Sequence, residues 1–182
     1  AIKKGTGELD GVIYEEILYE GYGPHNVALI VEVLTDNRNR TIASIRHAFS
    51  KGGGSLGSSN SVQYMFDRIG VIHVAKNKID EDTLTEIILE AGAEDFQSDH
   101  PDEYRIITAT DDFDEVRSCL EHAGVPMLSA GIVWNPQNRV EIDDSSKAEQ
   151  VIKLIETLED DDDVQSVHSN FDVSESLMDA LA

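Results

Sequence analysis

The stretch from Gly70 to Trp134 decides the fold: GVIHVAKNKIDEDTLTEIILEAGAEDFQSDHPDEYRIITATDDFDEVRSCLEHAGVPMLSAGIVW. Short runs rich in β-branched and aromatic residues alternate here with segments whose apolar residues recur at helical spacing. We expect the order strand, helix, strand, strand, helix, strand, at residues 70–75, 81–91, 94–98, 104–110, 112–123 and 127–134. This βαββαβ order is typical of a ferredoxin-like unit.

The flanking segments predict a second unit that contains both strands and helices. Before the stretch we expect strands at 12–20, 27–35 and 62–68 and a helix at 40–51; after it, strands at 139–142 and 164–173 with a helix between them. The late pieces complete the sheet that the early ones begin. The predicted fold class is therefore α+β with two domains: a mixed α+β domain of residues 1–69 and 136–182, interrupted by a ferredoxin-like βαββαβ insertion of residues 70–135.

The bulk composition limits the function. The chain of 182 residues carries a net charge of −22, which argues against wholesale wrapping by nucleic acid, because phosphate binding needs a positive footprint. One cysteine, Cys119, leaves no internal disulfide or multi-cysteine metal site and fits a reducing compartment. We find no apolar run long enough to span a membrane, and residues 1–30 show no signal-peptide pattern. The opening residues 1–11 resemble the tail of an earlier segment.

One segment stands apart from the acidic remainder. Residues 37–66 contain no Asp or Glu, although the chain has 36 of them and a window of this length is expected to hold about six. We call residues 37–66 the acid-free segment. Its basic residues are Arg38, Arg40, Arg46, His47 and Lys51. A neutral-to-basic island in a strongly acidic chain is a candidate contact for a polyanion. The alternative is a solvated helix face that arose by chance.

The acid-free segment predicts an amphipathic helix. Asn39 is the expected N-cap and Gly52 the expected stop. Helical spacing places Ile42, Ile45 and Phe49 on one face, and Arg40, Ser44, His47 and Lys51 on the opposite, solvent-facing side. The glycine-rich loop that follows is expected to let a phosphate backbone approach closely. The predicted nucleic-acid-binding residues are Arg38, Arg40, Arg46, His47, Lys51, Gly53 and Gly54.

The strings that resemble catalytic or metal-binding motifs lack the neighbouring elements or the ligand spacing that such sites need. The string GGSLG at 53–57 has the G-x-S-x-G spacing of a hydrolase elbow, but it follows a helix and precedes a strand, the reverse of what that elbow needs. The six histidines form no ligand cluster, and the five consecutive acids at 159–163 are expected to be a solvated turn. We therefore predict no enzyme activity, no cofactor and no metal.

The run from Tyr19 to Val71 resembles the signature of the YebC/PmpR family, above all in LTDNRNRT, in FSKGG and in the later SNFD of LEDDDDVQSVHSNFDV at 158–173. The resemblance covers nearly the whole chain. Members of that family have a basic N-terminal helical domain ahead of two α+β domains, and this chain resembles the last two. The resemblance implies a cytoplasmic regulator of gene expression, described as a probable DNA-binding transcriptional regulator. Organellar relatives act as translational activators.

Three functions remain open at this point. The first is DNA binding by the solvent face of the helix at 40–51, which needs side chains that reach base edges. The second is a translation role at the ribosome, with rRNA and ribosomal proteins as partners, because a small basic patch among acids suits a composite surface. The third is a protein-interaction scaffold without nucleic acid. We expect neither a membrane nor a small-molecule substrate as a partner.

Overall fold

The computed structural model describes residues 12–174 and Leu177, and these residues form two compact units. The first unit combines the chain before Asp67 with the chain from Pro136 onward, and the second spans Asp67–Asn135. Residues 1–11, on which the expectation of a preceding segment rests, lie outside the described residues. No helix of the described residues is both long enough and apolar enough to cross a membrane.

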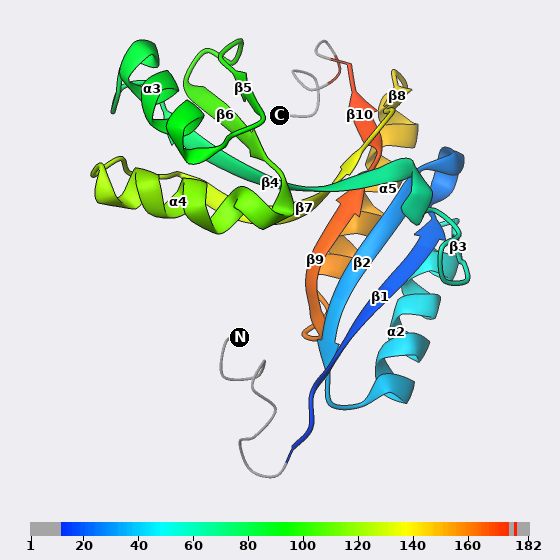
Figure 1. Cartoon of the computed structure of the whole chain (residues 1–182). Coiled ribbons are helices and arrows are strands. Elements are labelled where there is room, and N and C mark those ends of the chain that lie inside the picture. The colour runs from blue at the N-terminus through cyan, green and yellow to red at the C-terminus, as the bar shows by residue number, and fades with distance from the viewer. Residues whose placement is uncertain (1–11, 175–176, 178–182) are drawn as a thin grey trace. The chain divides into compact units, whose positions relative to one another are not determined.

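The first unit is a four-stranded sheet covered by two helices (Figure 1). Its elements are β1 (Glu15–Tyr22), η2 (Pro24–Asn26), β2 (Ala28–Thr35), α2 (Arg38–Lys51), β3 (Ser55–Leu56), η3 (Gln63–Met65), β8 (Val140–Ile142), α5 (Ser145–Glu159), β9 (Val164–Ser169) and β10 (Phe171–Val173). The strand order is β3-β1-β2-β9, with β1 and β9 both antiparallel to β2. The late strand β9 thus completes the early sheet, as the sequence predicts.

The core of the first unit lies between this sheet and its helices. Alternate residues of β2, such as Leu29 and Val31, are fully buried against Phe49 of α2 and Leu154 and Leu158 of α5. Side chains two apart along a strand share a face, which is why one strand supplies a continuous apolar row to both helices. Burial of each such side chain stabilises the folded chain by roughly 1.5–3 kcal/mol.

The second unit has the ferredoxin-like arrangement. Its elements are β4 (Phe66–Ala75), α3 (Glu81–Ala91), β5 (Asp95–Gln97), β6 (Glu103–Thr108), η4 (Thr110–Asp112), α4 (Phe113–His122) and β7 (Ser129–Pro136). The sheet order β5-β6-β4-β7 places the first and third strands of the βαββαβ run side by side in the centre. Helices α3 and α4 pack on one face through Leu84, Ile88, Val116 and Leu120. The predicted fold class is confirmed.

The structure moves the predicted strand 12–20 to Glu15–Tyr22 and replaces two predicted strands by one. Residues 62–68 and 70–75 do not form two strands; the turn η3 precedes the single long strand β4. The physical reason is Glu20, a carboxylate only 2 % exposed, which accepts backbone N–H groups of Asn60, Val62 and Gln63. Those N–H groups serve a side chain rather than a strand ladder, so the chain turns there.

Two further expectations are wrong. The predicted strand 164–173 is broken at Asn170, whose side chain accepts the Ala28 N–H while its carbonyl accepts the Val140 N–H, so β10 leaves the large sheet and pairs in parallel with β8. The N-cap of the first helix is Asn37, not Asn39: Asn37 is extended and its side chain accepts the Arg40 N–H. Gly52 ends the helix as expected.

Candidate nucleic-acid interface

Helix α2 carries all five basic residues of the acid-free segment, and all five side chains lie on its exposed surface. Its inward face holds Ile45 and Phe49, which are fully buried, and the half-buried Ile42. The predicted amphipathic character is therefore confirmed. The cations, however, are distributed over three surroundings: the N-terminal end of α2, its flank along β1, and its C-terminal end.

At the N-terminal end, Arg40 is bound to carboxylates. Its guanidinium donates to Asp36 at 2.8 Å and to Asp163 at 3.0 Å. One turn later, the Ser44 hydroxyl donates to Asp161 at 2.5 Å. The acidic turn of residues 160–163 thus closes over this end of α2, and the hollow there is lined mainly by aspartates. This environment repels an incoming phosphate.

The ionisation of the two partners reflects this pairing. Hydrogen bonds to Asp36 and then Asp163 raise the pKa of Arg40 above its usual value. Burial raises the pKa of Asp163, but hydrogen bonds from Thr41 and Arg40, together with the charge of Arg40, outweigh burial and hold the pKa of Asp163 below its usual value. The Thr41 hydroxyl bonds Asp163 at 2.8 Å and Thr35 at 2.7 Å, so the same carboxylate also anchors the first turn of α2.

Along the flank, Arg38 and Arg46 line a groove of about 330 Å³ beside β1. Arg38 approaches Glu15 at 3.9 Å, the longest of the ion pairs in the part of the chain that the structure describes. Arg46 makes no ion pair with any described residue. These two arginines face away from the acidic turn and toward the sheet edge.

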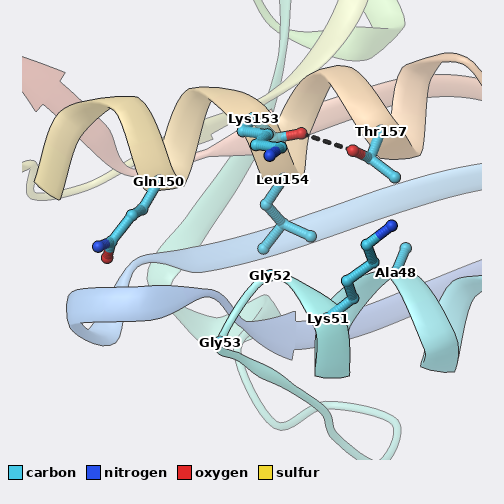
Figure 2. A pocket seen from close by; sticks show the side chains of 8 residues that line it. All are labelled: Ala48, Lys51, Gly52, Gly53, Gln150, Lys153, Leu154 and Thr157. Carbon is cyan, nitrogen blue, oxygen red and sulfur yellow. Dashed lines mark hydrogen bonds between the residues drawn. The ribbon is translucent and has the colours of Figure 1, made fainter. Parts of the chain in front are cut away.

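At the C-terminal end, Lys51 meets Lys153 of α5 around a pocket of about 440 Å³ (Figure 2). Its lining contains no carboxylate: the residues are Ala48, Lys51, Gly52, Gly53, Gln150, Lys153, Leu154 and Thr157. Neither lysine forms an ion pair with a described residue, in a chain that holds 36 acids. Two ammonium groups without ion pairs beside one pocket make it a candidate contact for an anion.

Lys153 is the residue that the sequence reasoning misses. It lies on α5, far from the acid-free segment in the chain, and packing of the buried Leu154 beside Gly52 brings the two helices together. Nothing in the sequence indicates that α5 lies beside α2, or that Leu154 is the contact between them. His47 is exposed one turn before Lys51 on the same helix.

The predicted glycines have a structural role. Gly53 has φ of +82°, in the left-handed region, and a Cβ on Gly54 would lie 2.1 Å from the Tyr22 carbonyl oxygen. The N–H groups of Gly52, Gly53 and Gly54 donate to carbonyls of Ala48, Ser50 and Phe49. These donors are therefore occupied within the protein, and any phosphate at this end relies on side-chain charge. Within the described residues, no group of three or more His, Cys, Asp or Glu side chains is arranged to hold a metal ion.

Comparisons with known proteins agree with the fold. A family model described as the TACO1/YebC second and third domain matches residues 14–171. Probable transcriptional regulatory proteins of Chlorobaculum tepidum and Desulfotalea psychrophila are 52% and 50% identical over 100% of this chain and 72% of their own lengths. The crystal structure of a conserved hypothetical protein from Aquifex aeolicus superposes with a TM-score of 0.82 at 46% identity, covering 96% of this chain and 71% of that one. The resemblance found in the sequence is confirmed, and this chain belongs to the TACO1/YebC family.

Proposed function

We propose that this chain is a non-enzymatic, nucleic-acid-binding regulator of transcription, and that the pocket between Lys51 and Lys153 contacts the phosphate backbone of DNA. The names of its relatives, probable transcriptional regulatory proteins, support the regulatory role. The main support for this DNA contact is the pocket lining. It contains no carboxylate and holds two lysines without ion pairs, in a chain of net charge −22.

Lys51 and Lys153 can attract a phosphate without first leaving a carboxylate partner. A lysine that is free of carboxylate partners pays no cost of breaking an ion pair when a phosphate arrives, and it releases a condensed counterion from DNA. The C-terminal end of a helix carries a partial negative charge, which opposes an anion, so Lys51 and Lys153 must supply the attraction together. His47 is exposed one turn before Lys51 and can donate a hydrogen bond to a phosphate oxygen.

The other predicted residues take smaller shares in this proposal. Arg40 must leave two carboxylates before it can bind phosphate. Arg38 and Arg46 lie on the flank and attract a polyanion at longer range. Gly53 and Gly54 shape the end of α2 without offering N–H donors. We therefore place the main contact on Lys51 and Lys153 of the first unit.

The test compares two double charge reversals in the full-length protein. Lys51→Glu with Lys153→Glu should weaken binding to a labelled DNA duplex by roughly tenfold or more at near-physiological salt. Lys78→Glu with Lys147→Glu is the matched control, because both side chains are exposed and change the net charge equally. Equal losses in the two proteins would show that only net charge matters, and the pocket would not be the site.

A parallel measurement separates transcription from translation. Crosslinked lysate is fractionated on a sucrose gradient with the wild-type protein and with the Lys51/Lys153 variant. We expect the wild-type protein to stay at the top of the gradient while it retains DNA at the same salt. Co-migration with ribosomal particles, lost in the variant, would replace DNA by rRNA as the partner of this pocket.

A further inference from the structure

The outer edge of β1 is open over most of its length. Strand β3 pairs with β1 only at Gly21 and Tyr22, while β2 pairs with the whole of β1 on the other side. On the β3 side, no strand of the described residues pairs with residues 15–19. Such an edge displays unpaired backbone N–H and C=O groups and is a template for another strand.

The direction of the open backbone groups follows from the one loop contact at this edge. The Gly57 N–H donates to the Glu20 carbonyl, so the backbone groups of Glu20 point outward, away from β2. Because successive residues of a strand direct these groups to opposite sides, Leu18 and Glu16 also point theirs outward. The edge therefore offers alternating donors and acceptors, which match a peptide backbone and not a phosphodiester chain.

Helix α2 supplies a wall beside this edge. The groove of about 330 Å³ is lined by β1 residues and by Arg38, Ile42 and Arg46, which are spaced four apart on one stripe of the helix. The helix runs in the same direction as β1, since Arg38 lies near Glu15 and Phe49 lies near Gly21. A strand added to β1 would therefore run along this stripe.

The floor of the groove contains a polar group without a partner. The Tyr19 side chain is 9% exposed and lines the groove, and its hydroxyl finds no hydrogen-bond partner among the described residues. A buried hydroxyl that lacks a partner costs free energy, which an incoming acceptor would recover. The one acid in the lining, Glu20, is already satisfied by backbone N–H groups of the loop at 60–63.

We propose that the groove between β1 and α2 binds an extended, acidic segment of a partner protein, which adds a strand to the edge of β1. Arg38 and Arg46 are eight residues apart, a distance of about 12 Å along a helix. Residues i and i+4 of a strand are separated by about 13 Å. The segment therefore carries acids at i and i+4, which face Arg38 and Arg46, and an apolar residue at i+2, which faces Ile42.

The probe is a fluorescein-labelled peptide in which Glu, Val and Glu occupy alternate positions between threonines. Fluorescence anisotropy with the whole chain should show saturable binding, and a peptide with Lys in place of both Glu should bind at least roughly tenfold more weakly. Arg38→Glu with Arg46→Glu should cause a comparable loss, whereas Lys78→Glu with Lys147→Glu, equal in charge, should not. Equal binding of the two peptides would overturn the proposal.

A separate variant tests whether backbone hydrogen bonds at the edge of β1 contribute to peptide binding. Leu18→Pro removes an outward N–H without touching a β2 hydrogen bond and should abolish binding, while Leu18→Thr keeps that N–H and should retain it. Amide chemical shifts of the wild-type chain give a readout that depends on no variant: the signals of residues 16–20 should move on titration. Shifts confined to other regions would refute the edge site.

The same peptide and variants also test two other ligands of the groove, a nucleic acid and a second copy of this chain. Displacement of the peptide by DNA or RNA at near-physiological salt would assign the groove to nucleic acid and overturn the protein partner. Concentration-dependent dimerisation in sedimentation, abolished by Leu18→Pro, would assign the edge to a second copy of this chain. We expect neither. Because Lys51 and Lys153 lie outside this groove, loss of DNA binding in their variant leaves this proposal untouched.

Discussion

The two ends of helix α2 differ in how their cations are used. At the N-terminal end, Arg40 is held by Asp36 and Asp163, and the neighbouring hollow is acidic. At the C-terminal end, Lys51 lies beside a pocket that contains another lysine and no carboxylate. Both cations belong to the same acid-free segment of the sequence. From this difference we expect a charge to be most available to a ligand where the fold brings no opposite charge close to it.

The same comparison separates two structural tasks. The N-terminal end binds the acidic turn of residues 160–163 and so connects α2 to β9, whereas the C-terminal end closes tightly through Gly52, Gly53 and Gly54. The contact of the N-terminal end with the acidic turn depends on ionised groups. The tight turn at the C-terminal end depends on glycines, which have no Cβ.

The largest effect is expected from Gly54→Ala, at the C-terminal end. A Cβ there would meet the Tyr22 carbonyl oxygen at 2.1 Å and the Gly23 Cα at 2.8 Å, both backbone atoms that cannot rotate away. We expect a loss of about 3 kcal/mol in the free energy of unfolding. Urea denaturation measures it, with Gly131→Ala as control, since nothing lies within 4 Å of a Cβ at Gly131. Equal stability of the two variants would show that the loop shifts freely.

The next effect concerns the N-terminal end and depends on pH. Asp163→Asn removes the charge that accepts from Arg40 and Thr41, and we expect a loss of about 1–3 kcal/mol at neutral pH. Because the pKa of Asp163 is lowered on folding, its contribution to stability is complete above the unfolded pKa of about 3.9 and is lost as the pH falls through the folded pKa.

Chemical unfolding at several pH values measures whether the contribution of Asp163 to stability decreases as the pH falls. The difference in stability between the wild-type chain and the Asn variant should shrink as the pH drops below about 4. Asp162→Asn is the matched control, because Asp162 is exposed in the same turn and should show a small effect at every pH. A difference that stays constant across the range would mean that Asp163 acts by shape and not by charge.

Local rules predicted much of the fold. Helix α3 begins and ends where the sequence indicates, at Glu81 and Ala91, because Asp80 caps its first turn and Gly92 adopts the left-handed conformation that stops it. The ferredoxin-like order follows from the same local periodicity. The errors come from distant partners: Glu20 redirects the loop at 60–63, and Asn170 is fixed by Ala28 and Val140.

The candidate site shows the same division. Helical spacing predicted that the cations of α2 are exposed, since exposure depends on which face is apolar. It did not predict that Arg40 meets Asp163, or that Lys153 lies beside Lys51, because both pairings depend on the placement of α5 and the turn after it. Whether a cation meets a carboxylate depends on how distant segments pack together, and a short window of sequence contains no information about that packing.

A smaller effect is expected from Gly53→Ala. Its φ of +82° is strained for residues with a Cβ, although the space is open, with the nearest atom, Pro24 Cβ, at 3.7 Å. We expect a loss of about 1 kcal/mol, and less for Gly53→Asn, because Asn tolerates the left-handed region. Both values come from thermal or urea unfolding. If the Asn variant keeps its DNA affinity, Gly53 shapes the end of the helix and does not touch the ligand.

The smallest effect is the sharpest test of the comparison, because it changes one charge at a time. Lys51→Gln should reduce the slope of log K against log salt for DNA binding by about 0.9, the value for one lost phosphate contact. Arg40→Gln removes the same charge from the other end of α2 and should leave the slope unchanged, because its guanidinium is already bound to Asp36 and Asp163. Equal reductions would show that DNA displaces the two aspartates, and availability would then be set by the ligand and not by the fold. A reduction in the Arg40 variant alone would move the contact to the N-terminal end.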